Sequence, residues 1–285
     1  MTQQVSFDFL KEALPKRDPE GHKGTFGKVL VVGGAVGYTG APYLTAEAAI
    51  RSGCGLVYLG VPESIWAVEA AKCVSSMPFP LKDRDGKLHS KALLEMEERL
   101  VNCDVLALGP GMGRSRQVTQ VVANLLQTEK PVVLDADGLN AISEHIDVLD
   151  ARRGKMTILT PHDGEFLRLG GDLSGDREEA ASRFAKEHGC VLVLKGHRTL
   201  IAVPEGNVLE NTTGNSGLAK GGSGDVLTGI IASLLAQGAT PVRAAALGVW
   251  LHGRAGDYAA EWKTAYGMTP MDVLDALPAA FMELM

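Results

Sequence analysis

The segment NTTGNSGLAKGGSGDVLTG, residues 211–229, carries the residue types best suited to chemistry. Five of the eleven residues from Gly214 to Gly224 are glycine, and an apolar helical pattern starts directly after them. Glycine leaves backbone N–H groups open to a ligand and accepts a positive φ. Open amides followed by a helix N-terminus form a binding site for an anion such as phosphate. Lys220 adds a cation within the same loop.

Asp225 stands where this helix is expected to begin, and two interpretations of it are open. Aspartate is a favoured N-cap residue and stabilises a helix there by about 1 kcal/mol. A carboxylate beside a bound phosphate can instead take a proton from an alcohol as a general base. We favour the base, because a cap alone leaves the preceding glycines unexplained.

The chain lacks the two best-known glycine-rich phosphate motifs. There is no G-x-x-x-x-G-K-[ST] sequence, and GGAVGYTG at 33–40 does not match G-x-G-x-x-G. No acidic residue closes the second expected strand as a ribose ligand, since Glu63 lies beyond Pro62. These absences exclude a P-loop enzyme and disfavour a Rossmann dehydrogenase.

Apolar runs that alternate with helical patterns must position the glycine-rich loop. Uninterrupted hydrophobicity indicates strands buried on both faces, as in a parallel sheet. The expected strands are 28–34, 56–62, 104–111, 131–138, 156–162 and 190–196, with a hairpin over 199–210 that turns at 204–207. Helical patterns cover 41–53, 64–71, 90–102, 116–130 and most of the last eighty residues. We therefore expect a single domain over residues 1–285, an α/β fold of the three-layer α/β/α sandwich type with a mostly parallel central sheet. Residues 1–20 receive no role.

Polar residues and glycines gather where the expected strands end. They are Gly33, Gly34, Gly37 and Gly40; Gly109, Gly111 and Gly113; Asp135 and Asp137; His162 and Glu165; and Lys195 and His197. Ligands of open parallel sheets bind outside the carboxyl ends of the strands. These clusters predict a crevice lined by polar groups and exposed backbone.

Composition excludes several classes of function. The net charge of −6, with 45% hydrophobic and 22% charged residues, leaves no basic footprint for nucleic acid or anionic lipid. No apolar run approaches the ~18 residues of a membrane helix, and the N-terminus lacks the apolar core of a signal peptide. The four separated cysteines form no C-x-x-C pair and fit reduced thiols. We expect a cytoplasmic protein without a nucleic-acid or membrane partner.

Seven motifs occur in an order that resembles one family of ribokinase-like enzymes, the ADP-dependent NAD(P)H-hydrate dehydratases. They are HKGTFGKVLVVGG, GYTGAPYLTAEAAIRSGCGLV, LGPGMG, LDADGLN, LTPHDGEF, VLKGHRTLIA and the segment from Asn211 to Gly238. The resemblance runs from about residue 22 to the final helices. It implies a ribokinase-like fold and a hydro-lyase that uses ADP and Mg²⁺ to restore NADH or NADPH from their hydrates (S epimer), giving AMP and phosphate. It also implies a homo-oligomer, with a tetramer as one form, and cooperation with a separate epimerase.

The same resemblance implies roles for individual residues. Asp225 would be the catalytic base, and Gly222, Ser223 and Gly224 would form an anion hole around the transferring phosphoryl group. The AMP moiety would be held by Lys195, Gly196, His197, Arg198, Thr199 and Gly224. The hydrated dinucleotide would lie opposite, near Ala41, Gly111, His162 and Asp225. Glu165 and Asn215 are candidates to orient Mg²⁺ through water, the metal ligands stay open, and Asp135 and Asp137 receive no role.

Other interpretations of the same residues stay open. The cations of residues 195–199 also fit a solvated turn between a strand and a hairpin, and His162 also fits a structural role. A ribokinase-like kinase acting on the alcohol of a vitamin precursor needs the same anion hole and base, although GYTGA and TPHDGEF favour the dehydratase. A non-catalytic nucleotide sensor would keep the glycines and lose the base, so the presence of Asp225 argues against it.

Overall fold

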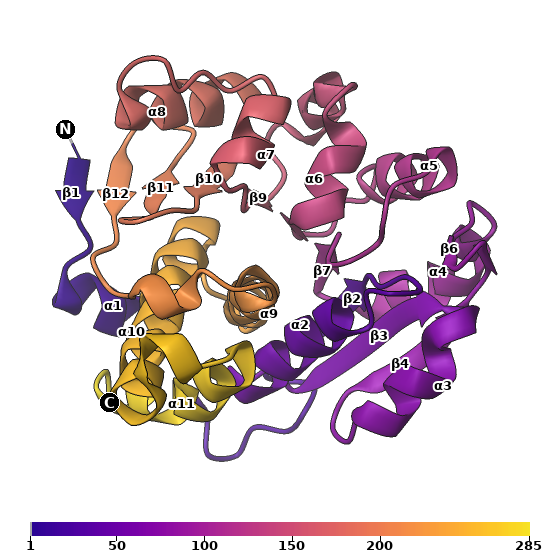
Figure 1. The fold of residues 1–285 in the computed structure, drawn as a ribbon, viewed down its shortest axis with the longest axis horizontal. Helices are drawn as coiled ribbons and strands as arrows, with labels where there is room; N and C mark the ends of the chain where they lie inside the picture. The colour runs from indigo at the N-terminus through magenta and orange to yellow at the C-terminus, as the bar shows by residue number, and fades with distance from the viewer. Residues whose placement is uncertain (1) are drawn as a thin grey trace.

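The computed structural model describes residues 2–285, which build a ten-stranded sheet with helices on both faces (Figure 1). The strand order is β1-β12-β11-β10-β9-β8-β7-β2-β3-β4, and β5 and β6 form a separate hairpin. The strands are β1 Thr2–Gln4, β2 Lys28–Val32, β3 Leu56–Pro62, β4 Met77–Leu81, β5 Asp83–Arg84, β6 Lys87–Leu88, β7 Val105–Leu108, β8 Val132–Leu134, β9 Thr157–Leu159, β10 Val191–Leu194, β11 Leu200–Ala202 and β12 Val208–Glu210. The helices are α1 Phe7–Ala13, α2 Gly40–Arg51, α3 Glu63–Lys72, α4 Ala92–Asn102, α5 Arg116–Leu125, α6 Ala136–Ile142, α7 Asp163–Arg168, α8 Arg177–His188, α9 Ser223–Ala236, α10 Pro241–Gly267 and α11 Pro270–Met282, with 3₁₀ turns η1 Ile146–Arg152 and η2 Ser216–Leu218.

The expected parallel sheet is confirmed. Neighbouring strands from β4 through β3, β2, β7, β8 and β9 to β10 pair in parallel, and the predicted hairpin β11–β12 continues the sheet with antiparallel pairing. The strand expected over 131–138 is shorter than predicted, because Ala136 already begins α6. This early helix start leaves Asp135 at the carboxyl edge of the sheet.

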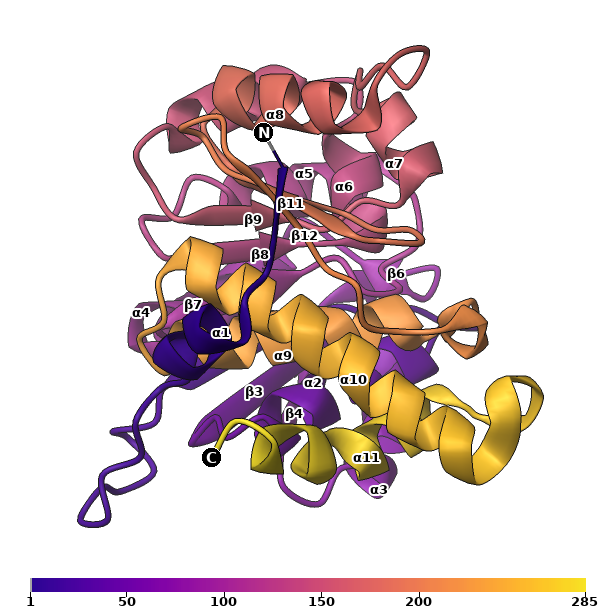
Figure 2. The ribbon, with the colours of Figure 1, turned by 90° about the vertical axis from the view of Figure 1, so that its left-hand side faces the viewer.

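Two hydrophobic cores cover the two faces of the sheet. On one face α1, α2, α9, α10 and α11 pack against inward side chains such as Val31 and Val193. On the other face α4 to α8 pack against alternate side chains such as Leu30 and Leu192. The long helix α10 runs beside α9 and α11 (Figure 2). Both faces of each central strand are therefore buried, as the continuous hydrophobic runs indicate.

Two edge strands escape the sequence patterns. β4 contains Pro78 and Pro80, which lack the N–H group of a ladder donor. The prolines lie two residues apart, so their nitrogen atoms face the same side of this edge strand. The missing N–H groups therefore cost no hydrogen bond with β3. The N-terminal segment, which receives no role from the sequence, supplies β1 beside β12 and the helix α1, capped by Ser6.

No helix within residues 2–285 combines the length and apolar character that a membrane crossing requires. The four cysteines are free thiols, and Cys54, Cys103 and Cys190 are buried.

Candidate active site

The N-terminus of α9 presents an open group of backbone amides. Gly222 is the N-cap, with φ +101°, and a Cβ there would lie 2.7 Å from Leu44 Cδ1. Only glycine fits both the backbone angle and the space. Within residues 2–285, the amides of Gly222, Gly224 and Asp225 meet no hydrogen-bond acceptor. The Ser223 amide, which is predicted to belong to the anion hole, instead donates to the carbonyl of Lys220 at 3.2 Å, because the chain turns tightly into the helix there. Three free N–H groups at the start of a fourteen-residue helix are suited to bind an anion such as phosphate, which keeps the predicted anion site a candidate.

Asp225 is not the N-cap of α9, so the capping interpretation is wrong. It is the third residue of the helix, and its carboxylate makes no capping hydrogen bond. The pKa of Asp225 is raised to about 7, first by burial and then by the nearby Asp135, while Lys195 opposes the shift. A carboxyl group that titrates near neutrality and lies beside an anion site is suited to take a proton from an alcohol.

Lys195 supplies the positive charge of the site. Its ammonium lies 2.9 Å from Asp135 Oδ1 and 3.8 Å from Glu165 Oε2. Burial opposes this charge, but the pKa of Lys195 is raised because the neighbouring carboxylates outweigh burial. A Cβ on Gly224 would lie 3.2 Å from Lys195 Nζ, so the cation stands directly beside the open amides. Lys195 is therefore a paired, mostly buried cation and not part of a solvated turn.

Asp135 connects the sheet to α9. It is 1% exposed, accepts a hydrogen bond from Lys195 with one carboxylate oxygen and one from Thr228 Oγ1, at 2.7 Å, with the other. Thr228 lies one turn after Asp225 on the same helix face. This network fixes the ammonium of Lys195 relative to the carboxylate-bearing turn of α9.

Ala41 and Gly111, two predicted substrate residues, lie together, and α2 connects them to Asp225. Gly111 has φ +62°, and a Cβ there would lie 3.0 Å from the Cβ of Ala41. The hydroxyl of Thr45 lies 3.1 Å from the carbonyl oxygens of both Ala41 and Asp225. The first two turns of α2 thus connect the loop after β7 to the start of α9.

The His162 ring caps a helix with one nitrogen and exposes its other side. Its Nδ1 accepts hydrogen bonds from the amides of Gly164, at 3.0 Å, and Glu165, at 3.3 Å, so it caps α7. These bonds put the proton of a neutral ring on Nε2, which lies 3.6 Å from Glu165 Oε2. The side chain is 55% exposed, and a β-bridge pairs His162 with Lys195. The ring can donate to a ligand while it caps the helix.

The segment after Lys195 forms an exposed turn into β11. Gly196 and His197 are exposed, and Thr199 Oγ1 donates to the carbonyl of Gly196 at 3.2 Å. Arg198 adopts φ +58°, and its guanidinium pairs with Glu210 Oε1 at 2.9 Å. The backbone of this turn borders Lys195, whereas the Arg198 side chain is held at β12.

Lys220 and Asn215 take other partners than the sequence suggests. The Lys220 ammonium donates to the carbonyl oxygens of Tyr266 at 2.8 Å and Met268 at 2.5 Å, and so does not serve as a point charge in the anion site. The Asn215 amide donates to the carbonyl of Gly256 at 2.9 Å and to Asp257 Oδ1 at 3.0 Å. Asn215 is therefore engaged with α10, whereas Glu165 lies beside Lys195.

The donor set fits Mg²⁺ only in a phosphate-bound form. No three His, Cys, Asp or Glu side chains gather into a metal cluster anywhere in the described part of the chain. Asp135 and Glu165 both face the Lys195 ammonium. Mg²⁺ commonly keeps several waters and binds phosphate oxygens, so these carboxylates suit contacts through water.

Three contributors to the site lie outside the sequence-based assignment. Asp135 is one of the polar residues at the ends of the expected strands, and Thr228 follows Asp225 at helical spacing, so both have a signal in the sequence. Arg177 had no signal: its guanidinium donates to the carbonyl of Lys195 at 2.9 Å and to Asp163 at 2.9 Å. Its role depends on how α8 packs against the end of β10.

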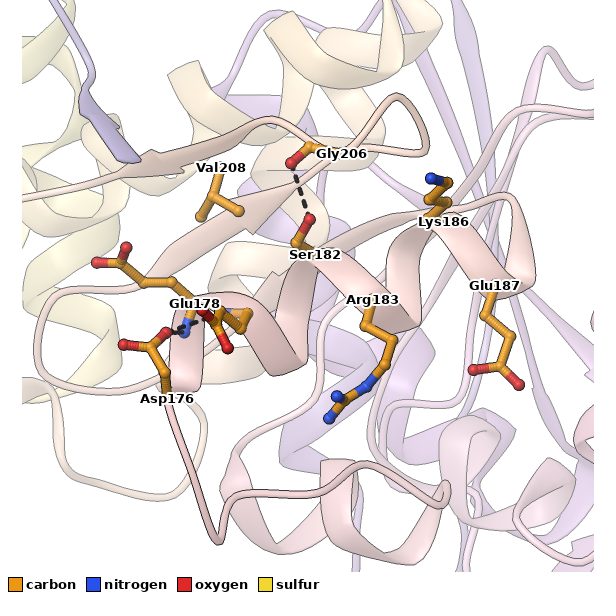
Figure 3. Close-up of a pocket in the computed structure, with 9 residues that line it drawn as sticks. Asp176, Glu178, Ser182, Arg183, Lys186, Glu187, Gly206 and Val208 are labelled. Atoms are coloured by element: carbon orange, nitrogen blue, oxygen red, sulfur yellow. Dashed lines mark hydrogen bonds between the residues drawn. The ribbon is translucent and has the colours of Figure 1, made fainter. Parts of the chain in front are cut away.

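A surface depression of about 680 Å³ lies elsewhere, on α8 and the β11–β12 turn (Figure 3). Arg183, Lys186 and Glu187 of α8 and Gly206 of the turn line it. Asp176 there caps α8 by accepting hydrogen bonds from two backbone amides at 2.8 Å. The depression belongs to the opposite face of the sheet from α9 and shares no residue with the site above.

Comparisons with known proteins agree on one family. A family model described as NAD(P)H-hydrate dehydratase matches residues 29–279. The chain is 46% identical over 274 residues to the bifunctional NAD(P)H-hydrate repair enzyme of Moorella thermoacetica, covering 94% of this chain and 52% of that protein. It is 36% identical over 276 residues to the ADP-dependent (S)-NAD(P)H-hydrate dehydratase of Bacillus subtilis, covering 95% of each. The chain spans about half the length of the bifunctional curated relatives it matches.

A solved structure has the same fold over the whole chain. The Bacillus subtilis ADP/ATP-dependent NAD(P)H-hydrate dehydratase, co-crystallised with ATP and Mg²⁺, superposes with a TM-score of 0.82 and 30% identity. The alignment covers 100% of this chain and 99% of that one.

Proposed function

Because this chain belongs to the NAD(P)H-hydrate dehydratase family, we propose that it catalyses the ADP-dependent dehydration of the S hydrates of NADH and NADPH. The reaction would return NADH or NADPH and release AMP and phosphate. The observation that supports it best is the position of Asp225. Its carboxyl group has a pKa raised to about 7 by burial and stands on the helix turn that carries the open amides.

The first step is phosphoryl transfer from ADP to the hydroxyl of the hydrated ring. The AMP moiety would lie along residues 195–199, with the β-phosphoryl group at the amides of Gly222 and Gly224. Asp225 takes the hydroxyl proton as the oxygen bonds to the β-phosphorus. The bond between that phosphorus and the α,β-bridging oxygen breaks, and AMP leaves with its electron pair.

The second step eliminates the new phosphate. The C–O bond breaks and phosphate leaves with the bonding electrons, while the lone pair of the ring nitrogen stabilises the developing positive charge. A proton then leaves the adjacent ring carbon for water, which restores the ring double bond. Ala41 and Gly111 leave room for the ring opposite the anion site, because neither carries a side chain longer than methyl.

Mg²⁺, when bound, would neutralise charge on the phosphate oxygens. Lys195 is placed to do the same from the protein side, since its ammonium lies beside Gly224 and is held by Asp135. His162 would donate from Nε2 to the dinucleotide. The homo-oligomer and the separate epimerase belong to this proposal on the family resemblance alone, and the cytoplasmic location belongs to it on the composition and the reduced cysteines.

The test is recovery of the reduced-nicotinamide absorbance. The full chain is incubated with hydrated NADPH, ADP and Mg²⁺, and AMP and phosphate are measured alongside. We expect one AMP and one phosphate for each NADPH restored, no recovery without nucleotide, and a comparison with ATP to identify the preferred donor. If no NADPH returns and phosphate is instead transferred to the alcohol of a vitamin precursor, the chain is a kinase.

A further inference from the structure

The loop that forms the anion site has little regular structure of its own. Between β12 and α9, only the single 3₁₀ turn Ser216–Leu218 is regular. Free glycine-rich backbone samples many conformations, and holding it in one costs conformational entropy. The loop must therefore be fixed from outside. Thr213 Oγ1 donates to the carbonyl of Trp250 in the first half of α10, and the contacts nearest the open amides lead to the C-terminal half of that helix.

The start of the loop is held by Asp257 of α10. One oxygen of this carboxylate accepts a hydrogen bond from the amide of Gly214 at 3.1 Å, and the other accepts one from the Asn215 side chain at 3.0 Å. Asn215 Oδ1 in turn accepts from the amide of Gly217 at 2.9 Å. Gly214 adopts φ +105°, so the chain turns sharply at the point where Asp257 holds it.

The end of the loop is held by Lys220, directly before Gly221 and Gly222. Its ammonium is bound by the carbonyl oxygens of Ala265, Tyr266 and Met268, where α10 ends. Carbonyls at a helix C-terminus carry a partial negative charge and attract a cation. No carboxylate forms an ion pair with Lys220 in the part of the chain that the structure describes.

These two contacts bracket the residues that shape the anion site. Asp257 of α10 binds Gly214 and Asn215 at the start of the loop. Lys220, two positions before the N-cap Gly222, is bound at the C-terminal end of the same helix. Each side chain has its polar atoms committed to the protein. Neither needs to touch a ligand to influence the amides.

We propose that Asp257 and Lys220 are positioning residues, which hold both ends of the glycine-rich loop on α10 so that its open amides converge before the nucleotide arrives. The inference rests on the proposed function only in taking ADP as the ligand of this loop. Preorganised donors bind an anion more tightly than donors that must be ordered on binding. Loosening either contact therefore weakens nucleotide binding while the dinucleotide side, at Ala41 and Gly111, is unaffected.

The test measures ADP binding to the full chain by calorimetry in the presence of Mg²⁺. Lys220→Met and Asp257→Asn should each weaken ADP binding about tenfold or more, whereas the KM for the hydrate stays at the wild-type value. Lys220→Arg should restore most of the affinity, because its guanidinium still donates to the same carbonyls. Lys263→Met, at an exposed lysine of α10, is the matched control for loss of a positive charge.

Wild-type ADP affinity in both Lys220→Met and Asp257→Asn would overturn the proposal. Equal loss in the Lys263→Met control would also overturn it, because the effect would then be long-range charge and not loop position. Thermal unfolding of each variant identifies any that fail to fold.

Hydrogen exchange of the free wild-type protein supplies a test without variants. The amides of Gly214 and Gly217 should be protected, and exchange at the rate of an unstructured peptide would overturn the proposal. This result and the ADP affinities do not depend on NADPH recovery. Failure of the proposed dehydration with intact ADP binding is thus distinguishable from failure of the positioning role.

Discussion

Asp225→Asn should cost activity and gain stability, because the position is built for a charge that the folded chain disfavours. Burial, followed by Asp135, raises the pKa of Asp225 from its ordinary 3.8 to about 7. One pKa unit corresponds to 1.36 kcal/mol, so ionising Asp225 costs the folded chain about 4 kcal/mol more than the unfolded chain. The carboxylate is partly open to water, and screening reduces the expected cost to about 2–4 kcal/mol. Asparagine keeps the shape and removes the cost.

The effect of Asp225→Asn on the free energy of unfolding depends on pH. Between about pH 4 and pH 7 the folded chain binds more protons at Asp225 than the unfolded chain, so this group lowers wild-type stability as pH rises through that window. Asparagine does not titrate. The stability gain of Asp225→Asn should therefore be close to zero near pH 4 and reach about 2–4 kcal/mol near pH 8.

Chemical denaturation at about pH 4 and about pH 8 measures this difference, with Asp8→Asn as a control at an exposed aspartate. Turnover of hydrated NADPH should fall about 10²- to 10⁴-fold, the usual worth of a general base. A stability gain that is absent near pH 8, or equal at both pH values, would refute the burial argument. Turnover at the wild-type rate would show that Asp225 is not the base.

Three further outcomes follow from particular contacts. Asp135→Asn should lower the pKa of Asp225 and so move the acidic limb of the pH profile of kcat/KM to lower pH. Asp137→Asn should shift the limb in the same direction by a smaller amount. An acidic limb that does not move would contradict the electrostatic coupling between these carboxylates and Asp225. Arg152→Met should lower the free energy of unfolding by about 3–5 kcal/mol in chemical denaturation, because this 1%-exposed guanidinium donates to four backbone carbonyls that would lose their partner. A loss below about 1 kcal/mol would mean that water replaces it. Thr264→Gly should raise stability in thermal unfolding, because φ 63° and ψ 159° cost a non-glycine residue about 1–3 kcal/mol, against about 1 kcal/mol for the added freedom of glycine; a lower Tm would show that Thr264 is not strained.

The sequence by itself determined the layered fold and the location of the anion site. Buried parallel strands and helices leave local patterns, and the continuous apolar runs at 28–34 and 190–196 contain β2 and β10 as observed. Glycines before a helix report a local backbone requirement, which Gly222 meets with its positive φ. The edge strands β1 and β4 were missed, because a short strand paired on one side needs no continuous apolar run.

Only the tertiary structure decided how each side chain is used. Asp135 meets Lys195 across 60 positions of sequence and Thr228 across 93, and these contacts turn an unassigned aspartate into the centre of the site. Asn215 and Lys220 sit in the most informative segment of the chain, yet their partners lie on α10 and just beyond it. A residue type and its spacing specify what a side chain can bind. Burial and the packing of distant elements specify what it does bind, and the pKa of Asp225 is set by the same two factors.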